Sequence, residues 1–535
     1  MKTKFLLYIL FIQMILLSCK KSFLNEDLVS TYAPQNTLVD SLGFEAAMAG
    51  LQAQVRTQYT YAGDQGLIGC MYLGTDMTTS IPAQSTTAML PYYQYSTMSS
   101  TDPGALYYWQ WAYQTINNAN LIIQGAENPA VTATGAANKA YIDAEARFYR
   151  AYAYNFLVTL WGPVPLITVP LTAPKIDFTR ASVDSVNAQV VADLTYAAGV
   201  LPNADNVRKE GRPNIAMAQQ LLAEAYLRMN KPDLAQQECQ AVINSGTFSL
   251  TTSRYGVHAS QAGDYYSDMF VYGNERRSQG NKEGIWIVEQ DLNTPGGSTN
   301  SDQHRRMWVP GYYGEAGMLI CDSLGGRGIG RMRLSRWIMY NLYDNYDMRN
   351  SLYSIHRVFY YNDPSNTALY GKQVIVTGTD TLTKICPYTT KWNYYNPADQ
   401  FGYGTIKDLI MMRLGETYLL LAEAQFRQNN PIGAAASINV LRQRAYPDYP
   451  LHGQVQASDI TLDFILDERA RELVAEENRR MTLVRTGTLL ERVQNLGDAG
   501  ATAITGIAAR NVLLPIPQTE IDLNEDAVLA QNTGY

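Results

Sequence analysis

The chain has 535 residues, of which 46% are hydrophobic and 17% charged, with a formal net charge of -7. Because an average soluble domain has roughly 25% charged residues, this composition excludes a disordered acidic tail and a nucleic-acid-binding protein. Tyrosine is frequent, with 38 residues against 13 phenylalanines. A phenol ring joins an apolar face to a polar tip, so we expect half-exposed surfaces that contact a ligand or partner.

The first residues have the pattern of a secretion signal. Lys2 and Lys4 precede the apolar run 5–17, and small Ser18 stands before Cys19. This pattern is typical of a signal peptide, and the run is too short to span a bilayer comfortably. A cysteine in this place resembles a bacterial lipobox, which implies cleavage before Cys19 and acylation of that residue. A short N-terminal anchor and an ordinary signal with a chance cysteine are the alternatives.

Helical periodicity dominates the two ends of the chain after this signal. Between residue 250 and Tyr403, Gly, Asn, Ser, Tyr and Trp become frequent, and short strand-like pieces occur, such as 284–288 and 373–377. A second membrane segment is not predicted, since three prolines interrupt the best candidate, 157–171. Apolar residues at three- and four-residue spacing predict helices over 38–59, 106–124, 136–160, 183–201, 213–229, 232–246, 406–428, 432–445 and 462–484.

An internal repeat links the two helical ends. Residues 222–232 match residues 421–431 at seven of eleven positions, with a constant offset of 421 − 222 = 199. A helix, a turn with Pro and a second helix with Ala in its first turn are typical of a tetratricopeptide unit. Residues 143–148 resemble a degenerate third copy. The chain is therefore predicted to be mainly α, a tetratricopeptide-like helical-repeat scaffold with a loop-rich, partly β insertion, against the alternative of chance similarity between Ala-rich helices.

These patterns divide the chain into four parts. We expect a lipoprotein signal peptide at 1–18, an N-terminal helical-repeat part at 19–250, a loop-rich insertion at 251–405 and a C-terminal helical-repeat part at 406–535. Residues 19–535 are expected to form one compact domain. Because loops on a rigid scaffold commonly carry binding sites, the insertion is expected to contribute part of a ligand face.

The sequence indicates no catalytic residue, cofactor or metal site. The four histidines are dispersed, no GxSxG motif occurs, and the Gly-rich run 326–331 lacks the context of a phosphate loop, so it is interpreted as a flexible loop. Carboxylates facing each other across a cleft, as in a glycosidase, cannot be recognised from spacing. The charged run 467–480 is interpreted as a solvated helix face or an intrahelical salt network. The cysteines Cys70, Cys239, Cys321 and Cys386 are far apart without a CxxC pair, and their disulfide state is left open.

Three aromatic clusters are better candidates for function. They lie at 91–95, after a Thr/Ser-rich loop with Asp76 upstream, at 308–313, preceded by Arg306, and at 391–396. Flat rings beside polar side chains suit a sugar, whose C–H face packs on the ring while its hydroxyls take polar partners. The same composition suits peptides or a protein interface. For any single tyrosine, packing within its own loop is the favoured interpretation.

Several motifs together resemble the SusD/RagB-type outer-membrane lipoproteins, and the resemblance covers the whole chain. The ending is its most specific part. The chain departs from the family at Asn478, where the family carries Gly, and at 481–483, where the family's aromatic-Asp pair is absent. The segments that carry the resemblance are 23–27 after the lipobox, 144–152, 160–166, 413–424, 438–445, 468–473, 479–487, 514–524 and 531–535.

This resemblance implies a non-catalytic, nutrient-binding lipoprotein, anchored to the outer membrane through Cys19 and facing the cell exterior. It would capture oligosaccharides, or peptides as in RagB-like members, for a TonB-dependent, SusC-like transporter; nucleic acid is not an expected partner. A surface glycosidase or lyase, and a scaffold that only docks the transporter, are the alternatives; Lys20-Lys21 leave periplasmic retention open. Because family ligand sites lie on the loop-rich face, the candidate contacts are Asp76, Tyr92, Tyr93, Tyr95, Arg306, Trp308, Tyr312 and Tyr313.

Overall fold

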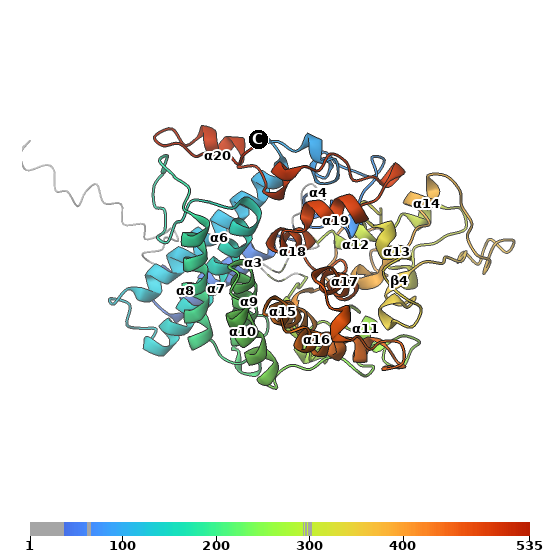
Figure 1. Cartoon of the computed structure of the whole chain (residues 1–535), viewed down its shortest axis with the longest axis horizontal. Coiled ribbons are helices and arrows are strands. Elements are labelled where there is room, and N and C mark those ends of the chain that lie inside the picture. Colours follow the sequence, from blue (N-terminus) through green and yellow to red (C-terminus); the bar gives the residue numbers. More distant parts are fainter. Residues whose placement is uncertain (1–36, 61–65, 293, 295–296, 298–301) are drawn as a thin grey trace, which may run out of the picture.

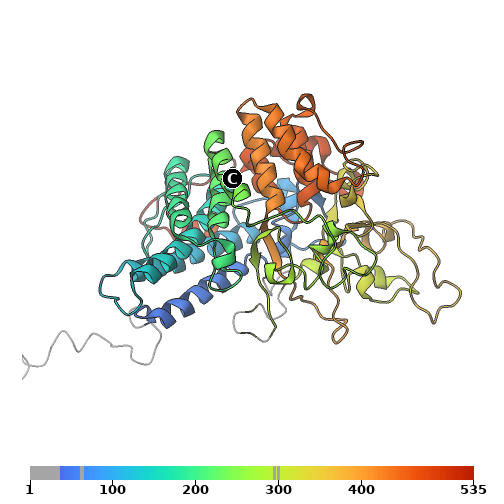
Figure 2. The same cartoon turned by 90° about the horizontal axis from the view of Figure 1, so that it is seen from below.

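Long helices form most of the molecule. The computed structural model describes residues 37–60, 66–292, 294, 297 and 302–535, so the predicted signal peptide and Cys19 lie outside the described residues. The N-terminal helices occupy one side, the C-terminal helices the middle, and the short elements of the insertion the opposite side (Figures 1 and 2). The predicted fold class, mainly α with a partly β insertion, is confirmed.

Two long antiparallel helices, α6 and α7, form the centre of the N-terminal half. Helix α6 begins where Asp102 accepts hydrogen bonds from the backbone N–H groups of Gly104 and Ala105, at 3.0 and 3.3 Å. Helix α7 ends at Gly162, whose φ of 72° favours glycine. The helices of this half are α3 (Ser41–Arg56), α4 (Gly66–Gly69), α5 (Leu90–Tyr93), α6 (Pro103–Glu127), α7 (Ala136–Trp161), α8 (Val183–Val200), α9 (Ile215–Arg228) and α10 (Pro232–Asn244).

The sequence repeat folds as two equivalent helical hairpins. Helices α15 (Leu414–Arg427) and α16 (Pro431–Ala445) begin at the repeat offset from α9 and α10. Both turns hold an asparagine in the left-handed region, Asn230 with φ 54° and Asn429 with φ 57°. Small Ala223 and Ala235 pack with Leu420 and Ala424, so the hairpins share a core. The predicted repeat is confirmed, and α17 (Leu462–Leu473), α18 (Arg479–Thr486), α19 (Leu489–Leu496) and α20 (Gln518–Asp522) follow it.

The segment between the two hairpins contains only short elements in its described residues. Strand β2 (Gly284–Val288) pairs antiparallel with β6 (Leu409–Arg413), which leads directly into α15. The three-part division of the mature chain stays a prediction. The remaining short elements are β1 (Thr78–Thr79) paired with β3 (Arg333–Leu334), β4 (Ile355–His356) paired with β5 (Tyr388–Thr389), α11 (Tyr265–Asp268), α12 (His304–Trp308), α13 (Arg336–Tyr340) and α14 (Asp380–Thr383).

The end of α7 packs against the C-terminal segment. The indole N–H of Trp161 donates to the carbonyl of Pro515 at 2.8 Å. The amide of Asn532 in turn donates to the carbonyls of Trp161 and Leu514, at 3.0 and 2.8 Å. Arg180 donates to the Asn532 Oδ1 at 2.6 Å. This network fastens the last residues of the chain to the N-terminal half.

The charged run 467–480 is mostly buried, so its interpretation as a solvated helix face is wrong. Of the alternative, an intrahelical salt network, the structure shows the pair Glu468–Arg471 at 3.0 Å, but most partners come from other elements. Glu472 has no exposed surface and accepts hydrogen bonds from Arg413 at 2.5 Å, Arg349 at 3.0 Å, and Arg444. Although burial raises the pKa of Glu472, these guanidinium groups hold it well below its usual range. Instead of pairing along their own helix, Asp467 binds Arg492 and Glu476 binds Arg413 and Lys391.

Two absences hold for the described part of the chain. Its helices include none that is long and apolar enough to cross a membrane. Its His, Cys, Asp and Glu side chains form no group of three or more placed to hold a metal ion. Among the described cysteines, Cys239, Cys321 and Cys386 are free thiols, and the thiol of Cys70 hydrogen-bonds to the carbonyls of Gly66 and Ala88.

Candidate ligand-binding surface

Asp76, predicted as a polar ligand contact, lies in the protein interior. Its side chain has no exposed surface. It accepts hydrogen bonds from Arg479 at 3.0 and 2.8 Å and from Arg492 at 2.7 Å. Burial raises the pKa of Asp76, but the two guanidinium groups bring it below its usual range. The carboxylate therefore stays ionised and ties the segment before β1 to α18 and α19.

The tyrosines of the first aromatic cluster are also core residues. Tyr92 and Tyr93 are 1% exposed and Tyr95 is 0% exposed. The Tyr95 hydroxyl donates to the carbonyl of Gly74 at 2.5 Å and accepts from Arg480 at 3.2 Å. A ring without an exposed face offers nothing for a sugar to pack on in this conformation. We therefore do not include these tyrosines in the proposed site.

The second cluster is divided between core and surface. Trp308 is buried with its ring edge-on to Tyr72 at 5.6 Å, and Tyr312 is buried with its hydroxyl donating to the carbonyl of Gly326 at 2.9 Å. Tyr313 is half-buried, and the guanidinium of Arg306 lies beneath the exposed ring of Tyr403. Of the eight predicted contacts, Arg306 and Tyr313 are the two that the structure brings to a surface feature.

Arg306 and Tyr313 belong to a group that we call the arginine–aromatic patch, completed by Arg327, Phe401 and Tyr403. Phe401 and Tyr403 are 65% and 61% exposed. The Cζ of Arg306 lies 4.1 Å from the Tyr403 ring centroid, and that of Arg327 lies 4.8 Å from the same centroid and 5.9 Å from that of Phe401. The sequence reasoning missed Arg327, Phe401 and Tyr403, although the alternation of rings and glycines in 401–404 was a usable signal.

Backbone contacts hold the patch in place. Arg305 donates to the carbonyls of Tyr394 at 3.2 Å and Gly402 at 2.5 Å, which fixes the loop that carries the exposed rings. A Cβ at Gly326 would lie 2.3 Å from the Tyr394 carbonyl oxygen, and one at Gly328 would lie 1.8 Å from that of Val309. Glycine is therefore required for the close approach that presents Arg327 to this loop.

The two arginines of the patch lack counter-charges. Arg306 is 5% exposed and forms no hydrogen bond or ion pair through its side chain in the described structure, while Arg327 donates to the Phe401 carbonyl. Burial and then the charge of Arg327 lower the pKa of Arg306 to about 10, so it remains protonated at neutral pH. Burial also lowers the pKa of Arg327, but the hydroxyls of Tyr313 and Tyr403 give a net increase. The patch is therefore cationic.

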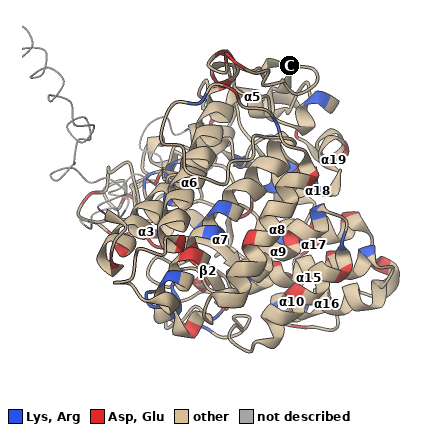
Figure 3. Ribbon diagram, turned by 90° about the vertical axis from the view of Figure 1, so that its left-hand side faces the viewer, with Lys and Arg blue, Asp and Glu red and all other residues tan. Residues whose placement is uncertain are grey.

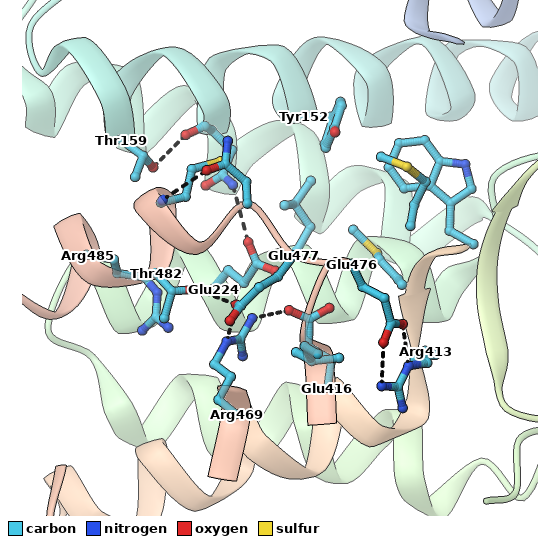
Figure 4. Close-up of a pocket in the computed structure, with 18 of the residues that line it drawn as sticks. Tyr152, Thr159, Glu224, Arg413, Glu416, Arg469, Glu476, Glu477, Thr482 and Arg485 are labelled. Atoms are coloured by element: carbon cyan, nitrogen blue, oxygen red, sulfur yellow. Dashed lines mark hydrogen bonds and ion pairs between the residues drawn. The ribbon is translucent and has the colours of Figure 1, made fainter. Parts of the chain in front are cut away.

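A second candidate is the cavity between the two helical halves (Figure 4). Residues of α7, α9, α15, α17 and α18 line it, and its volume is about 100 Å³. This is well below the roughly 300 Å³ at which small-molecule pockets begin. Its carboxylates are largely engaged, since Glu477 accepts from Arg469 at 2.5 Å and Glu476 from Arg413 at 2.7 Å. The cavity is a polar interior with room for a few waters rather than for a sugar.

Glu224 in this cavity should make stability depend on pH. It forms no ion pair in the described structure, and burial, followed by the charge of Glu416, raises its pKa to about 7 from 4.5. The folded protein therefore binds a proton that the unfolded chain releases, so Glu224 costs stability progressively as pH rises from about 4.5 through 7. Relative to wild type, Glu224→Gln should gain about 1–2 kcal/mol more at pH 8 than at pH 5 in urea unfolding.

The matched control is Glu423, which occupies the equivalent repeat position. Glu423 accepts from Arg485 at 2.8 Å, and although burial raises its pKa, Arg485 and Arg427 bring it below its usual range. Glu423→Gln should therefore destabilise the protein at both pH values. If the gain on Glu224→Gln were equal at pH 5 and pH 8, the assigned titration of Glu224 would be contradicted.

Comparisons with known proteins agree across nearly the whole chain. The profile described as "SusD family" matches residues 332–535, and one described as "Starch-binding associating with outer membrane" matches residues 33–227. SusD-like protein P25 of Formosa agariphila is 27% identical, covering 97% of each chain. Starch-binding protein SusD of Bacteroides thetaiotaomicron is 35% identical over 150 residues, 27% of this chain and 25% of that protein.

Solved structures share the fold. A laminarin binding SusD-like protein superposes with a TM-score of 0.70 at 21% identity, covering 93% of this chain and all of the other. Surface glycan-binding protein A from Bacteroides thetaiotaomicron, in complex with laminarihexaose, gives 0.71 at 21% identity, covering 92% of this chain and 99% of the other.

Proposed function

We propose, because the chain belongs to the SusD/RagB-like family, that it binds oligosaccharides at the outer membrane. The observation that carries this proposal is the arginine–aromatic patch. Its two rings are more than 60% exposed beside guanidinium donors, a combination that packs against the C–H face of a sugar and hydrogen-bonds its hydroxyls. The name of a relative, starch-binding protein SusD, supports a glycan as the ligand class.

The proposal extends to how the protein is placed and what it does with the ligand. Acylation of Cys19 would anchor it, facing the cell exterior, and it would pass the oligosaccharide to a TonB-dependent, SusC-like transporter without cleaving it. The lipobox pattern and the matching family description, "Starch-binding associating with outer membrane", support the anchor and the membrane. Engagement of the cavity carboxylates Glu476 and Glu477 by arginines supports a non-catalytic role.

Titration calorimetry with a panel of neutral oligosaccharides, acidic oligosaccharides and peptides tests this function. We expect an oligosaccharide to bind and to be recovered intact by chromatography. Phe401→Ala should weaken binding by about tenfold, as expected when a packed ring is lost. Tyr196→Ala is the control. Tyr196 lies on α8 in the N-terminal half and, like the patch rings, is an exposed ring beside a guanidinium group, that of Arg147. Binding of peptides alone would favour a RagB-like role, cleavage would favour a glycosidase or lyase, and binding of neither class would overturn the proposal.

A further inference from the structure

Arg306 differs from the other buried arginines of the described chain in having no partner for its guanidinium group. Arg305, Arg333 and Arg480 form no ion pair either, but each donates to a backbone carbonyl. Arg349, Arg413 and Arg479 each lie within 3.0 Å of a carboxylate. Arg306 and Arg327 form no ion pair in the described part of the chain. Leaving a desolvated charge without a counter-charge costs several kcal/mol, so the position of Arg306, which is 5% exposed, is unfavourable in the isolated protein.

The groups around the patch do not remove this positive charge. Arg331 adds a further cation that lowers the pKa of Arg306, and the other neighbours that act on it are the phenols of Tyr313 and Tyr403. Burial lowers the pKa of Arg305, and the acidic neighbour Asp399 opposes this only in part, without forming an ion pair in the described structure. The concentration of cations is local, because the whole chain carries a formal charge of -7.

On the opposite side of the molecule, where the N-terminal helices lie, charged residues of both signs occur together. There, acidic and basic residues are scattered and intermixed along the helices (Figure 3). Arg208 illustrates it: its guanidinium also lies over a tyrosine ring, 4.2 Å from that of Tyr141, but Glu45 lies 3.5 Å away as its counter-charge. A guanidinium stacked on a tyrosine is therefore not by itself unusual in this protein. Arg480 over Tyr95 also lacks a carboxylate but donates to the Asn511 carbonyl, whereas Arg306 has neither kind of partner in the described structure.

We propose that an anionic group of the ligand supplies the missing counter-charge, so that the oligosaccharide bound at the arginine–aromatic patch is an acidic one. This inference rests on the proposed function. A planar guanidinium forms paired hydrogen bonds with a carboxylate or a sulfate ester, and these charge-assisted bonds are about twice as strong as neutral ones. Phe401 provides an exposed ring for the sugar face beside Arg327. A neutral glycan could hydrogen-bond to the two arginines but would supply no counter-charge.

Calorimetry with matched saccharides tests this proposal on the full mature chain. A galacturonate hexamer is compared with its methyl ester, and a κ-carrageenan oligosaccharide with its desulfated form, so that the members of each pair share a sugar backbone and differ at the charged group. A hexamer of glutamate represents acidic peptides. We expect at least one acidic saccharide to bind at least tenfold more tightly than its neutral partner. We also expect this preference to shrink when NaCl is raised from 50 to 300 mM, because exposed charge pairs are screened. The two pairs distinguish a uronate from a sulfate ester as the source of the charge.

Substitutions connect the preference to the patch. Arg327→Gln should abolish most of the preference for the acidic saccharide, whereas Arg208→Gln, which removes an equal charge over a tyrosine ring elsewhere, should not. Arg306→Gln should also reduce the preference and, because it removes an unpaired charge, should not lower the urea midpoint of the free protein. The half-exposed Arg327 keeps the test decisive if the Arg306 variant does not fold.

The outcomes separate the two proposals. Equal binding of acidic and neutral saccharides, or an acidic preference that survives Arg327→Gln, would overturn the inference and leave the proposed function intact. Binding of the glutamate hexamer in place of any saccharide would overturn both in favour of an acidic peptide. Failure of every saccharide and of the peptide to bind would likewise overturn both.

Discussion

Replacing Asp76 by alanine should lower the free energy of unfolding by about 3–5 kcal/mol. The carboxylate has no exposed surface and is shared by Arg479 and Arg492, so its removal takes the buried counter-charge from two desolvated guanidinium groups. The partners that remain, Glu477 for Arg479 and Asp463 and Asp467 for Arg492, do not fill its place between them. Urea unfolding followed by circular dichroism measures the change.

Asp463 is the control for this substitution. It also pairs with Arg492, at 2.8 Å, but it is 72% exposed, so Asp463→Ala should cost less than about 1 kcal/mol. A stable Asp76→Ala protein that lost its ligand would contradict the structural role and restore Asp76 as a ligand contact.

Replacing Glu472 by alanine should be comparably severe, at about 3–5 kcal/mol. This carboxylate joins Arg349, Arg413 and Arg444, which come from the insertion, β6 and α16. Each arginine keeps another carboxylate, but the loss would remove the one that all three share and leave an excess of positive charge in the interior. The urea midpoint of the Glu472→Ala protein is the measurement.

An exposed ion pair provides the comparison for Glu472. Glu127 lies 2.5 Å from Arg147 and is 58% exposed, and Arg147 keeps Asp143 as a partner, so Glu127→Ala should change stability by less than about 1 kcal/mol. A loss on Glu472→Ala as small as that on Glu127→Ala would show that the buried network is not needed for the fold.

Local patterns predicted most of the helices and the repeat, because they depend on neighbours in the chain. Two predicted helices were wrong in part: 406–428 starts with strand β6 and is helical only from Leu414, and 462–484 is divided into α17 and α18. Apolar spacing, the turn prolines and the alanines of α9 and α15 are all visible within a few tens of residues. The same reasoning misjudged the charged run on α17 and α18, since intrahelical spacing says nothing of partners on other elements. Asp76, for example, meets Arg479 across 403 positions of sequence.

Local patterns also could not predict that most residues of the aromatic clusters are buried. A tyrosine or tryptophan beside Gly and Pro suits an exposed loop and the core of a loop-rich insertion equally well. Tyr95, Trp308 and Tyr312 take the second role. The patch was only partly predictable for the same reason: Arg306 was recognised, but the loop that places Tyr403 over its guanidinium comes from a distant part of the chain.

The hydrogen bonds between the end of α7 and the C-terminal segment determine when the N-terminal half can finish folding. The Asn532 amide reaches the carbonyl of Trp161 across 371 positions. The first long helices therefore cannot complete their contacts until the ribosome has added residue 532. An incomplete chain leaves the carbonyl of Trp161 without the Asn532 amide, so the last contacts of the N-terminal half form only after almost the whole chain has been made.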